Sequence, residues 1–83
     1  MAYSLIYTKT AARDIQKLDT VAKRKIGKKL KEYSQSPFVH AKKLTDPKIG
    51  TYRFRVGNYR IVFDTEGNNL VILRVGHRKE IYR

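Results

Sequence analysis

Three arginines in one short stretch are the side chains of this sequence best suited to chemistry. The stretch reads TYRFRVGNYRIVFD, and two alternating runs in it flank Gly57-Asn58, a dipeptide typical of two-residue hairpin turns. With that turn, Arg55 lies opposite Arg60, and Arg53 shares their face of the sheet. Like charges across a strand pair are destabilising and guanidinium groups match phosphate, so the pattern favours an anion site. The alternative is a solvated outer face that happens to be basic.

The other face of the same hairpin is predicted to be apolar and to form part of the core. Residues that face each other across a strand pair share one side of the sheet. In the register set by this turn, three apolar pairs share that side: Tyr52 with Phe63, Phe54 with Ile61, and Val56 with Tyr59. Core packing is therefore the expected role of these aromatic residues.

A strand and two helices are predicted before the hairpin. Residues 3–8 alternate as in a strand, with every second side chain on one side: Tyr3, Leu5 and Tyr7. Thr8 or Thr10 can cap a first helix, and Asp19 or Thr20 can start a second one. The second helix is expected to end at Ser36-Pro37. Both helices have apolar residues at helical spacing: Ala11, Ile15 and Leu18 in the first, and Ala22, Ile26, Leu30 and Tyr33 in the second.

The rest of the chain is predicted to form a connection and one more strand. The connection runs from residue 38 to residue 49, with Leu44 anchored in the core and His40 as a surface or core-edge residue. After the hairpin, Glu66-Gly67-Asn68 indicates a three-residue turn that leads into a strand at residues 70–75. A register with Thr65 opposite Asn69 buries Val71, Leu73 and Val75 and sets Arg74 beside Arg60 on the cationic face.

The predicted order of elements is strand, helix, helix, and then three strands in a meander. This order describes an α+β fold in which two N-terminal helices pack on one face of an antiparallel sheet. Eighty-three residues leave room for one core, so we expect a single domain spanning residues 1–83.

The charge of the chain indicates a polyanionic partner. Nineteen Lys and Arg residues stand against seven acidic ones, for a formal net charge of +12. Nucleic acid is the default partner of such a domain, and an acidic protein is a second possibility. Exposed lysines on the helices, Lys28 and Lys29 among them, are either solvated or in contact with an RNA backbone. The two histidines are far apart in sequence and cysteine is lacking, so no metal or other cofactor is expected.

No stretch approaches the roughly 20 apolar residues that a membrane span requires, and the N-terminus does not read as a signal peptide. We therefore expect a cytoplasmic protein without a membrane partner.

The sequence resembles the RelE/ParE superfamily of bacterial and archaeal toxins over essentially its whole length. The resemblance rests on the order of elements, on the run KKLTDPKIGTYRFRVGNYRIVFD and on the ending RVGHRKEIYR. That ending is more similar to the RelE branch, which cleaves messenger RNA in the ribosomal A site, than to the ParE branch, which poisons DNA gyrase. The resemblance implies a single RelE-like toxin domain and a type II toxin that acts as a metal-independent endoribonuclease.

The resemblance also implies roles for individual residues. Arg53 and Arg55 stand where well-known RelE members have two lysines that handle phosphate and proton transfer. Arg60 matches the arginine held to stabilise the transition state, and we expect it to be exposed in a groove. Arg78 matches a C-terminal arginine, and Tyr82 matches the tyrosine near the scissile phosphate. Because arginine practically cannot lose its proton, neither Arg53 nor Arg55 is a plausible general base.

His77 is the candidate that we consider for proton transfer. Cleavage by the ribose 2′-OH requires a group that removes its proton, and histidine is the side chain that ordinarily titrates near operating pH. The alternative for His77 is a structural role, in which it caps the end of the strand or hydrogen-bonds to the backbone.

Two other functions remain open at this point. One is a ParE-like, non-enzymatic inhibitor of DNA gyrase, and the other is a ribosome- or RNA-binding module whose catalysis is weakened by Arg53 and Arg55. The expected partners are the ribosome, messenger RNA and a cognate antitoxin with an acidic segment. The toxin is expected as a monomer or in a toxin–antitoxin hetero-oligomer.

Overall fold

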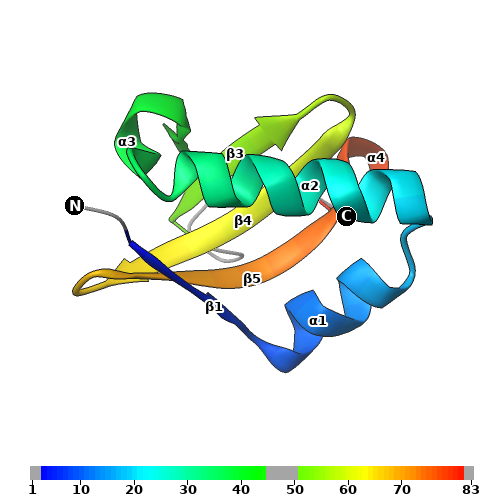
Figure 1. The fold of residues 1–83 in the computed structure, drawn as a ribbon, viewed down its shortest axis with the longest axis horizontal. Helices are drawn as coiled ribbons and strands as arrows, with labels where there is room; N and C mark the ends of the chain where they lie inside the picture. Colours follow the sequence, from blue (N-terminus) through cyan, green and yellow to red (C-terminus); the bar gives the residue numbers. More distant parts are fainter. Residues whose placement is uncertain (1–2, 45–50, 82–83) are drawn as a thin grey trace.

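The chain folds into a five-stranded sheet with its two long helices on one face (Figure 1). The computed structural model describes residues 3–44 and 51–81. The strands are β1 (Ser4–Tyr7), β2 (Lys42–Lys43), β3 (Tyr52–Val56), β4 (Tyr59–Glu66) and β5 (Asn69–His77). The helices are α1 (Lys9–Gln16), α2 (Thr20–Tyr33), α3 (Pro37–His40) and α4 (Arg78–Ile81). The predicted α+β class is confirmed.

The sheet is mixed, whereas the sequence predicted an antiparallel one. Its strand order is β1-β5-β4-β3-β2. The meander from β3 to β5 is antiparallel as expected, but β1 pairs with β5 in parallel, from Ser4 opposite Asn69 to Tyr7 opposite Ile72. The parallel strand is possible because α1 and α2 lead the chain from β1 across one face of the sheet to the opposite edge.

Side-chain caps fix where the two long helices begin. The Thr8 hydroxyl accepts the Ala11 N–H at 3.1 Å and donates to the carbonyl of Ile72 at 2.9 Å, so it also ties the start of α1 to β5. The Asp19 carboxylate accepts the Ala22 N–H at 2.7 Å at the start of α2. Of the alternatives in the sequence, Thr8 and Asp19 are therefore the caps.

The connection after α2 has more structure than the sequence predicted. Helix α2 ends at Tyr33, before Ser36-Pro37, and Pro37 begins the short helix α3. Strand β2 follows and pairs antiparallel with the first two residues of β3. Leu44 is half-buried, and its N–H donates to the carbonyl of Thr51 at 2.9 Å. Proline at the first helical position lacks only an N–H that would have no partner there, which explains the start of α3.

The last turn and the β4·β5 register differ from the prediction. Glu66 pairs with Asn69, so the turn has two residues rather than three, with Gly67 at a φ of 58°. The shorter turn shifts the pairing by one residue, and a one-residue shift exchanges the faces of a strand. Leu70 and Ile72 are therefore in the core in place of the predicted residues: Val71 and Leu73.

A bulge further along β5 shifts the register by one more residue, so the residues after it face the sides that the sequence predicted. Phe63 pairs with Ile72 but Val62 pairs with Arg74, so Leu73 is an extra residue in a bulge. Beyond the bulge, Val75 is buried on the helix side as predicted. Because of the bulge, β5 contributes to the core at both of its ends.

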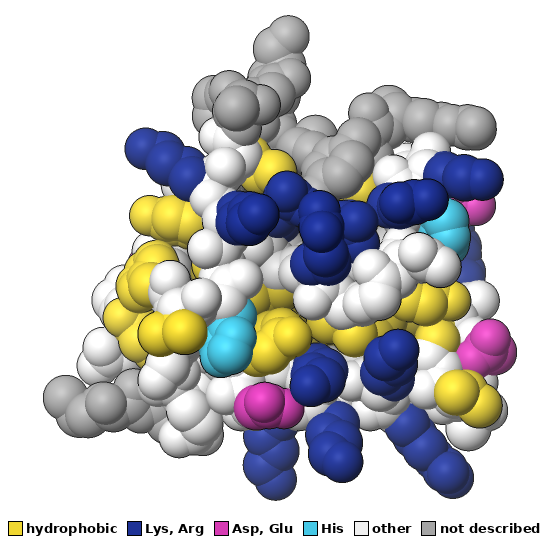
Figure 2. Space-filling view, turned by 90° about the horizontal axis from the view of Figure 1, so that it is seen from above, with side chains coloured by type: hydrophobic (Ala, Val, Ile, Leu, Met, Phe, Trp, Pro, Cys, Tyr) yellow, Lys and Arg dark blue, Asp and Glu magenta, His cyan; other side chains and the backbone are white. Residues whose placement is uncertain are grey.

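Basic side chains cover much of the surface around this sheet. Figure 2 shows Lys and Arg side chains in two groups, separated by a band of hydrophobic side chains, with few acidic side chains on this face.

Among residues 3–44 and 51–81, none of the helices combines the length and the apolar character that a membrane crossing requires.

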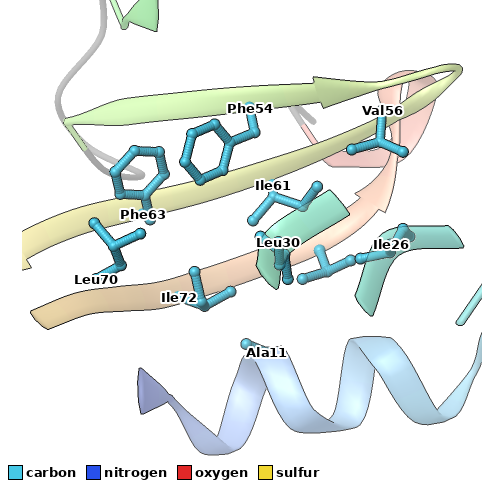
Figure 3. Close-up of a cluster of buried hydrophobic side chains, with 10 residues drawn as sticks. Ala11, Ile26, Leu30, Phe54, Val56, Ile61, Phe63, Leu70 and Ile72 are labelled. Atoms are coloured by element: carbon cyan, nitrogen blue, oxygen red, sulfur yellow. The ribbon is translucent and has the colours of Figure 1, made fainter. Parts of the chain in front are cut away.

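The core lies between the sheet and the two long helices (Figure 3). The rings of Phe54 and Phe63 stack with centroids 4.3 Å apart, at the centre of the apolar face predicted for the hairpin. Helices α1 and α2 close this face with the side chains that the helical spacing indicated: Ala11, Ile26 and Leu30. This packing leaves the other face of the hairpin for its arginines.

Candidate functional site

The β3–β4 hairpin places its three arginines on the face of the sheet opposite the two long helices, and we call this side the arginine face. Arg55 pairs with Arg60 and Arg53 pairs with Val62, as the sequence predicted. The turn between the strands has a positive φ at Gly57, of 58°, but not at Asn58. A positive φ at the first central residue alone is the feature of a type II′ turn.

Arg60 is buried, which corrects the expectation that it lies exposed in a groove. Only 6% of its surface is accessible. One of its guanidinium nitrogens, Nη1, donates to the carbonyl oxygens of Gly57 and Tyr59, both at 2.9 Å. The side chain therefore folds back over the hairpin turn and holds it closed. The charge of Arg60 is therefore buried and is not exposed on the arginine face.

Four side chains from α3, β2 and β3 line a small pocket beside the exposed part of the arginine face: His40, Lys42, Arg53 and Arg55. We call it the cationic pocket. Its volume is about 70 Å³. Lys42 pairs directly with Arg53, so β2 adds a third cation to the two predicted from the hairpin. A site with three cations can bind an anion, because the attractions of the three charges add to one another.

Arg74 is on the arginine face but its charge is compensated. It pairs with Val62 across the strands. Its Nε donates to Asp14 of α1 at 2.8 Å and its Nη2 to the same carboxylate at 3.3 Å, while the N–H of Val75 also donates to Asp14, at 3.0 Å. The hydrogen bond to Asp14 raises the pKa of Arg74. Arg74 therefore fastens α1 along the edge of β5.

The predicted C-terminal residues lie apart from the cationic pocket. His77 pairs with Tyr59 and so projects to the helix side of the sheet, where its Nδ1 accepts the N–H of Lys79 at 3.2 Å. The main chain of Arg78 donates to the carbonyl of Asn58 at 2.8 Å, which leaves an exposed side chain beside the hairpin turn. Tyr82 lies outside the described residues.

Lys28 and Lys29 lie on α2, on the other side of the sheet from the arginines. Lys29 makes a salt bridge of 3.5 Å with Glu32, and its Nζ lies 6.0 Å from the centroid of the Tyr33 ring. Neither lysine lines the cationic pocket.

An apolar groove runs between α1 and α2. It has a volume of about 350 Å³, and Ala12, Ile15 and Ile26 are among the residues that line it. Tyr7 lies at its edge, and burial raises the pKa of the Tyr7 hydroxyl. This groove gives the helix side of the molecule an apolar surface among its lysines.

Sequence reasoning missed His40 and Lys42 as members of the site. The signal was the pair Lys42-Lys43 directly before Leu44, since two polar residues before an apolar one can form a short edge strand. Across residues 3–44 and 51–81, no group of three or more His, Cys, Asp or Glu side chains could hold a metal ion.

Comparison with known proteins gives the family of the chain. A family model described as the ParE toxin of type II toxin–antitoxin systems, parDE, matches residues 5–82. Toxin RelG of Mycobacterium tuberculosis is 36% identical over 86 residues, and the match covers 100% of this chain and 99% of the relative. Toxin RelE3 of Methanocaldococcus jannaschii is 33% identical over 82 residues, which cover 94% of this chain and 93% of the relative. These matched proteins are all toxins.

Solved structures narrow the assignment to one branch. The toxin–antitoxin complex RelBE2 of Mycobacterium tuberculosis matches with a TM-score of 0.84 and 31% identity, over 94% of this chain and 100% of that chain. A mutant of the Escherichia coli toxin RelE in the free state matches with a TM-score of 0.76 and 28% identity, over 99% of this chain and 92% of that chain. The chain therefore belongs to the RelE/ParE superfamily of type II toxin–antitoxin toxins, in its RelE-like branch.

Proposed function

We propose that this toxin is a ribosome-dependent endoribonuclease that cleaves messenger RNA in the A site and so inhibits translation. The observation that carries the proposal is the cationic pocket, in which Arg53, Arg55 and Lys42 converge on one side of a RelE-like sheet. Convergent guanidinium groups are suited to a phosphate whose charge increases during the reaction.

The proposed reaction is an attack of a ribose 2′-OH on the adjacent phosphorus. The O2′–P bond forms and the P–O5′ bond breaks, which leaves a 2′,3′-cyclic phosphate and a 5′-OH. Arg53 and Arg55 bind the non-bridging oxygens, where negative charge develops in the transition state. Buried Arg60 does not bind the phosphate in this proposal. It holds the hairpin turn in place through its two hydrogen bonds and so positions Arg55 on the neighbouring strand. In this proposal side-chain cations supply the charge that a metal ion supplies in other nucleases.

The same proposal includes a cognate antitoxin. Solved relatives are RelB–RelE complexes from Methanococcus jannaschii and Escherichia coli. A toxin with a net charge of +12 fits a partner with an acidic segment, and the apolar groove between α1 and α2 offers it a hydrophobic surface. The ribosome and messenger RNA are the other proposed partners.

The test is a cleavage assay on ribosomes that carry a messenger with a defined A-site codon, with the cut mapped by primer extension. We expect cleavage within that codon by the wild type. Arg55→Gln should slow it about 10²–10³-fold, the usual cost of one lost preorganised donor. Lys9→Gln removes the same charge from an exposed position at the start of α1 and should leave the rate unchanged.

Two outcomes would overturn the proposal. Gyrase-dependent DNA breakage without messenger cleavage would support the ParE-like function, which the description of the matching family model favours. Ribosome binding without either activity would support an RNA-binding module.

A further inference from the structure

We propose that His40 is the catalytic general base of this toxin and that the cationic pocket is the site in which it meets the RNA phosphate. This inference rests on the proposed ribonuclease function and adds to it the residue that takes the 2′-OH proton. In the step, the 2′-OH proton moves to a ring nitrogen of His40, O2′ bonds to phosphorus, and O5′ leaves and takes a proton from water.

The pocket is small and cationic. Its volume is about 70 Å³, and Lys42, Arg53 and Arg55 line it. Guanidinium and ammonium groups donate to phosphate oxygens, so the scissile phosphate is the part of the RNA that this proposal places in the pocket.

His40 is the only histidine among the described residues that line the pocket, beside Lys42, Arg53 and Arg55. Histidine is the side-chain type used most often as a general base, whereas lysine and arginine offer donors that bind phosphate. No carboxylate lines the pocket in the described part of the chain. The cations can hold an anion but cannot accept a proton, so proton transfer in this pocket depends on His40.

The imidazole of His40 is held in a defined orientation. Its ring stacks on that of Tyr33 with centroids 4.3 Å apart and planes 20° apart. The Tyr33 ring packs on Phe54 of the core at 5.0 Å, and Lys29 adds a positive charge 6.0 Å from its centroid. Stacking fixes the plane of the imidazole and leaves its edge free. Neither ring nitrogen has a hydrogen-bond partner among residues 3–44 and 51–81.

The position of His77 excludes it from the same step. It projects to the helix side of the sheet, whereas Arg53 and Arg55 are on the other side. Its Nδ1 already accepts the N–H of Lys79. Helix α3, which ends at His40, and helix α4, which follows His77, lie at opposite ends of α2 in Figure 1. The two histidines therefore cannot act on one phosphate.

Single-turnover cleavage on programmed ribosomes tests the proposal, with the rate measured across about pH 5 to 8, where histidine ordinarily titrates. We expect H40Q to lower the rate about 10²–10⁴-fold, the usual contribution of a general base, and to flatten the pH profile. H40F keeps an aromatic ring on Tyr33 and should be as slow as H40Q. H77Q should stay near the wild-type rate, and ribosome binding should be unchanged in all three variants.

Several results would overturn the proposal. If H40F cleaves like the wild type, the stack on Tyr33 matters and the imidazole nitrogen does not. If H40Q weakens ribosome binding and keeps the wild-type pH profile, His40 is a phosphate ligand and not a base. If the wild type cleaves the messenger and H40Q cleaves it at the same rate, the ribonuclease function is supported and His40 is not its general base.

A readout without the ribosome tests the pocket by itself. The chain has only two histidines, so their ring proton signals in NMR spectra can be assigned with H40Q and H77Q. Addition of inorganic phosphate to the free toxin should shift the signal of His40 and not that of His77. Equal shifts, or none at millimolar phosphate, would contradict a phosphate pocket at His40 even in a toxin that failed to cleave.

Discussion

Arg55 and Arg60 lie opposite each other on β3 and β4, yet Arg55 is exposed and Arg60 is buried. Removing Arg60 leaves the carbonyl oxygens of Gly57 and Tyr59 without this donor. We expect Arg60→Ala to lower the free energy of unfolding by about 1–3 kcal/mol, because the turn would lose two hydrogen bonds from a charged donor. Urea denaturation followed by circular dichroism measures this loss.

Arg55→Ala is the matched control for that experiment. It removes the same side chain from the opposite position and relieves a like-charge contact, so the melting temperature should stay level or rise slightly. Equal losses in both variants would contradict a structural role for Arg60 at the turn.

Two salt bridges of this chain differ in how far they are buried, so they should contribute differently to the stability of the fold. The Asp14 carboxylate, with 11% of its side chain exposed, accepts hydrogen bonds from Arg74 and from the N–H of Val75. Asp14→Ala should therefore cost about 1–3 kcal/mol. Glu32 pairs with Lys29 at the surface, and Glu32→Ala should change stability by less than about 1 kcal/mol. Thermal unfolding of the two variants side by side gives the comparison, and a larger loss for Glu32→Ala would contradict it.

At the scale of single residues, the sequence predicted the arginine face but not the pocket. The alternation around Gly57 sets which side each hairpin residue takes, so the sequence alone is enough to place Arg53 and Arg55 on one face. The burial of Arg60 depends on the path of its side chain over the turn, which alternation does not encode. His40 reaches the pocket because α3 and β2 bring the connection back to the edge of β3, and that path depends on tertiary packing.

At the scale of elements, Thr8 connects two parts of the fold through one hydroxyl. It caps α1 and also donates to β5. Thr8→Val keeps the shape of the side chain and removes both hydrogen bonds, so we expect a loss of about 1–2 kcal/mol. Thr10→Val, at an exposed position in the same helix, should change stability by less than about 0.5 kcal/mol. Chemical denaturation of both variants checks the difference, and similar losses would argue against the link to β5.

The two long helices and the strands β1, β3, β4 and β5 were predicted, whereas α3, β2, α4 and the register of β5 were not. Helical spacing and cap residues marked α1 and α2, and the Gly57-Asn58 turn marked β3 and β4. In β5 the residues from Leu70 to Leu73 are all apolar, so either face could be buried and the pattern does not choose between them. The second Gly-Asn pair, at residues 67 and 68, was the clue that both hairpins have two-residue turns.

At the scale of the whole molecule, the charge of +12 sets how the toxin meets its proposed antitoxin. Attraction between unlike charges accelerates encounter, and salt screens it over about 10 Å at 0.1 M. We expect the association rate to fall steeply between low and moderate salt, while dissociation changes little where apolar surface is buried. Stopped-flow binding across a salt series, with the purified cognate antitoxin, measures both rates. An association rate independent of salt would contradict electrostatic steering.

Strand β2 pairs with only Tyr52 and Arg53, so the outer edge of β3 from residue 54 to 56 has no strand partner in the described part of the chain. An open sheet edge is a template on which a second copy of a protein can add and begin to aggregate. Here the edge carries Arg55 and is flanked by Lys42 and Lys43, so the positive charges of two copies repel each other as the copies approach. We therefore expect the repulsion at that edge to oppose aggregation, so the turbidity of concentrated samples should increase as salt screens it.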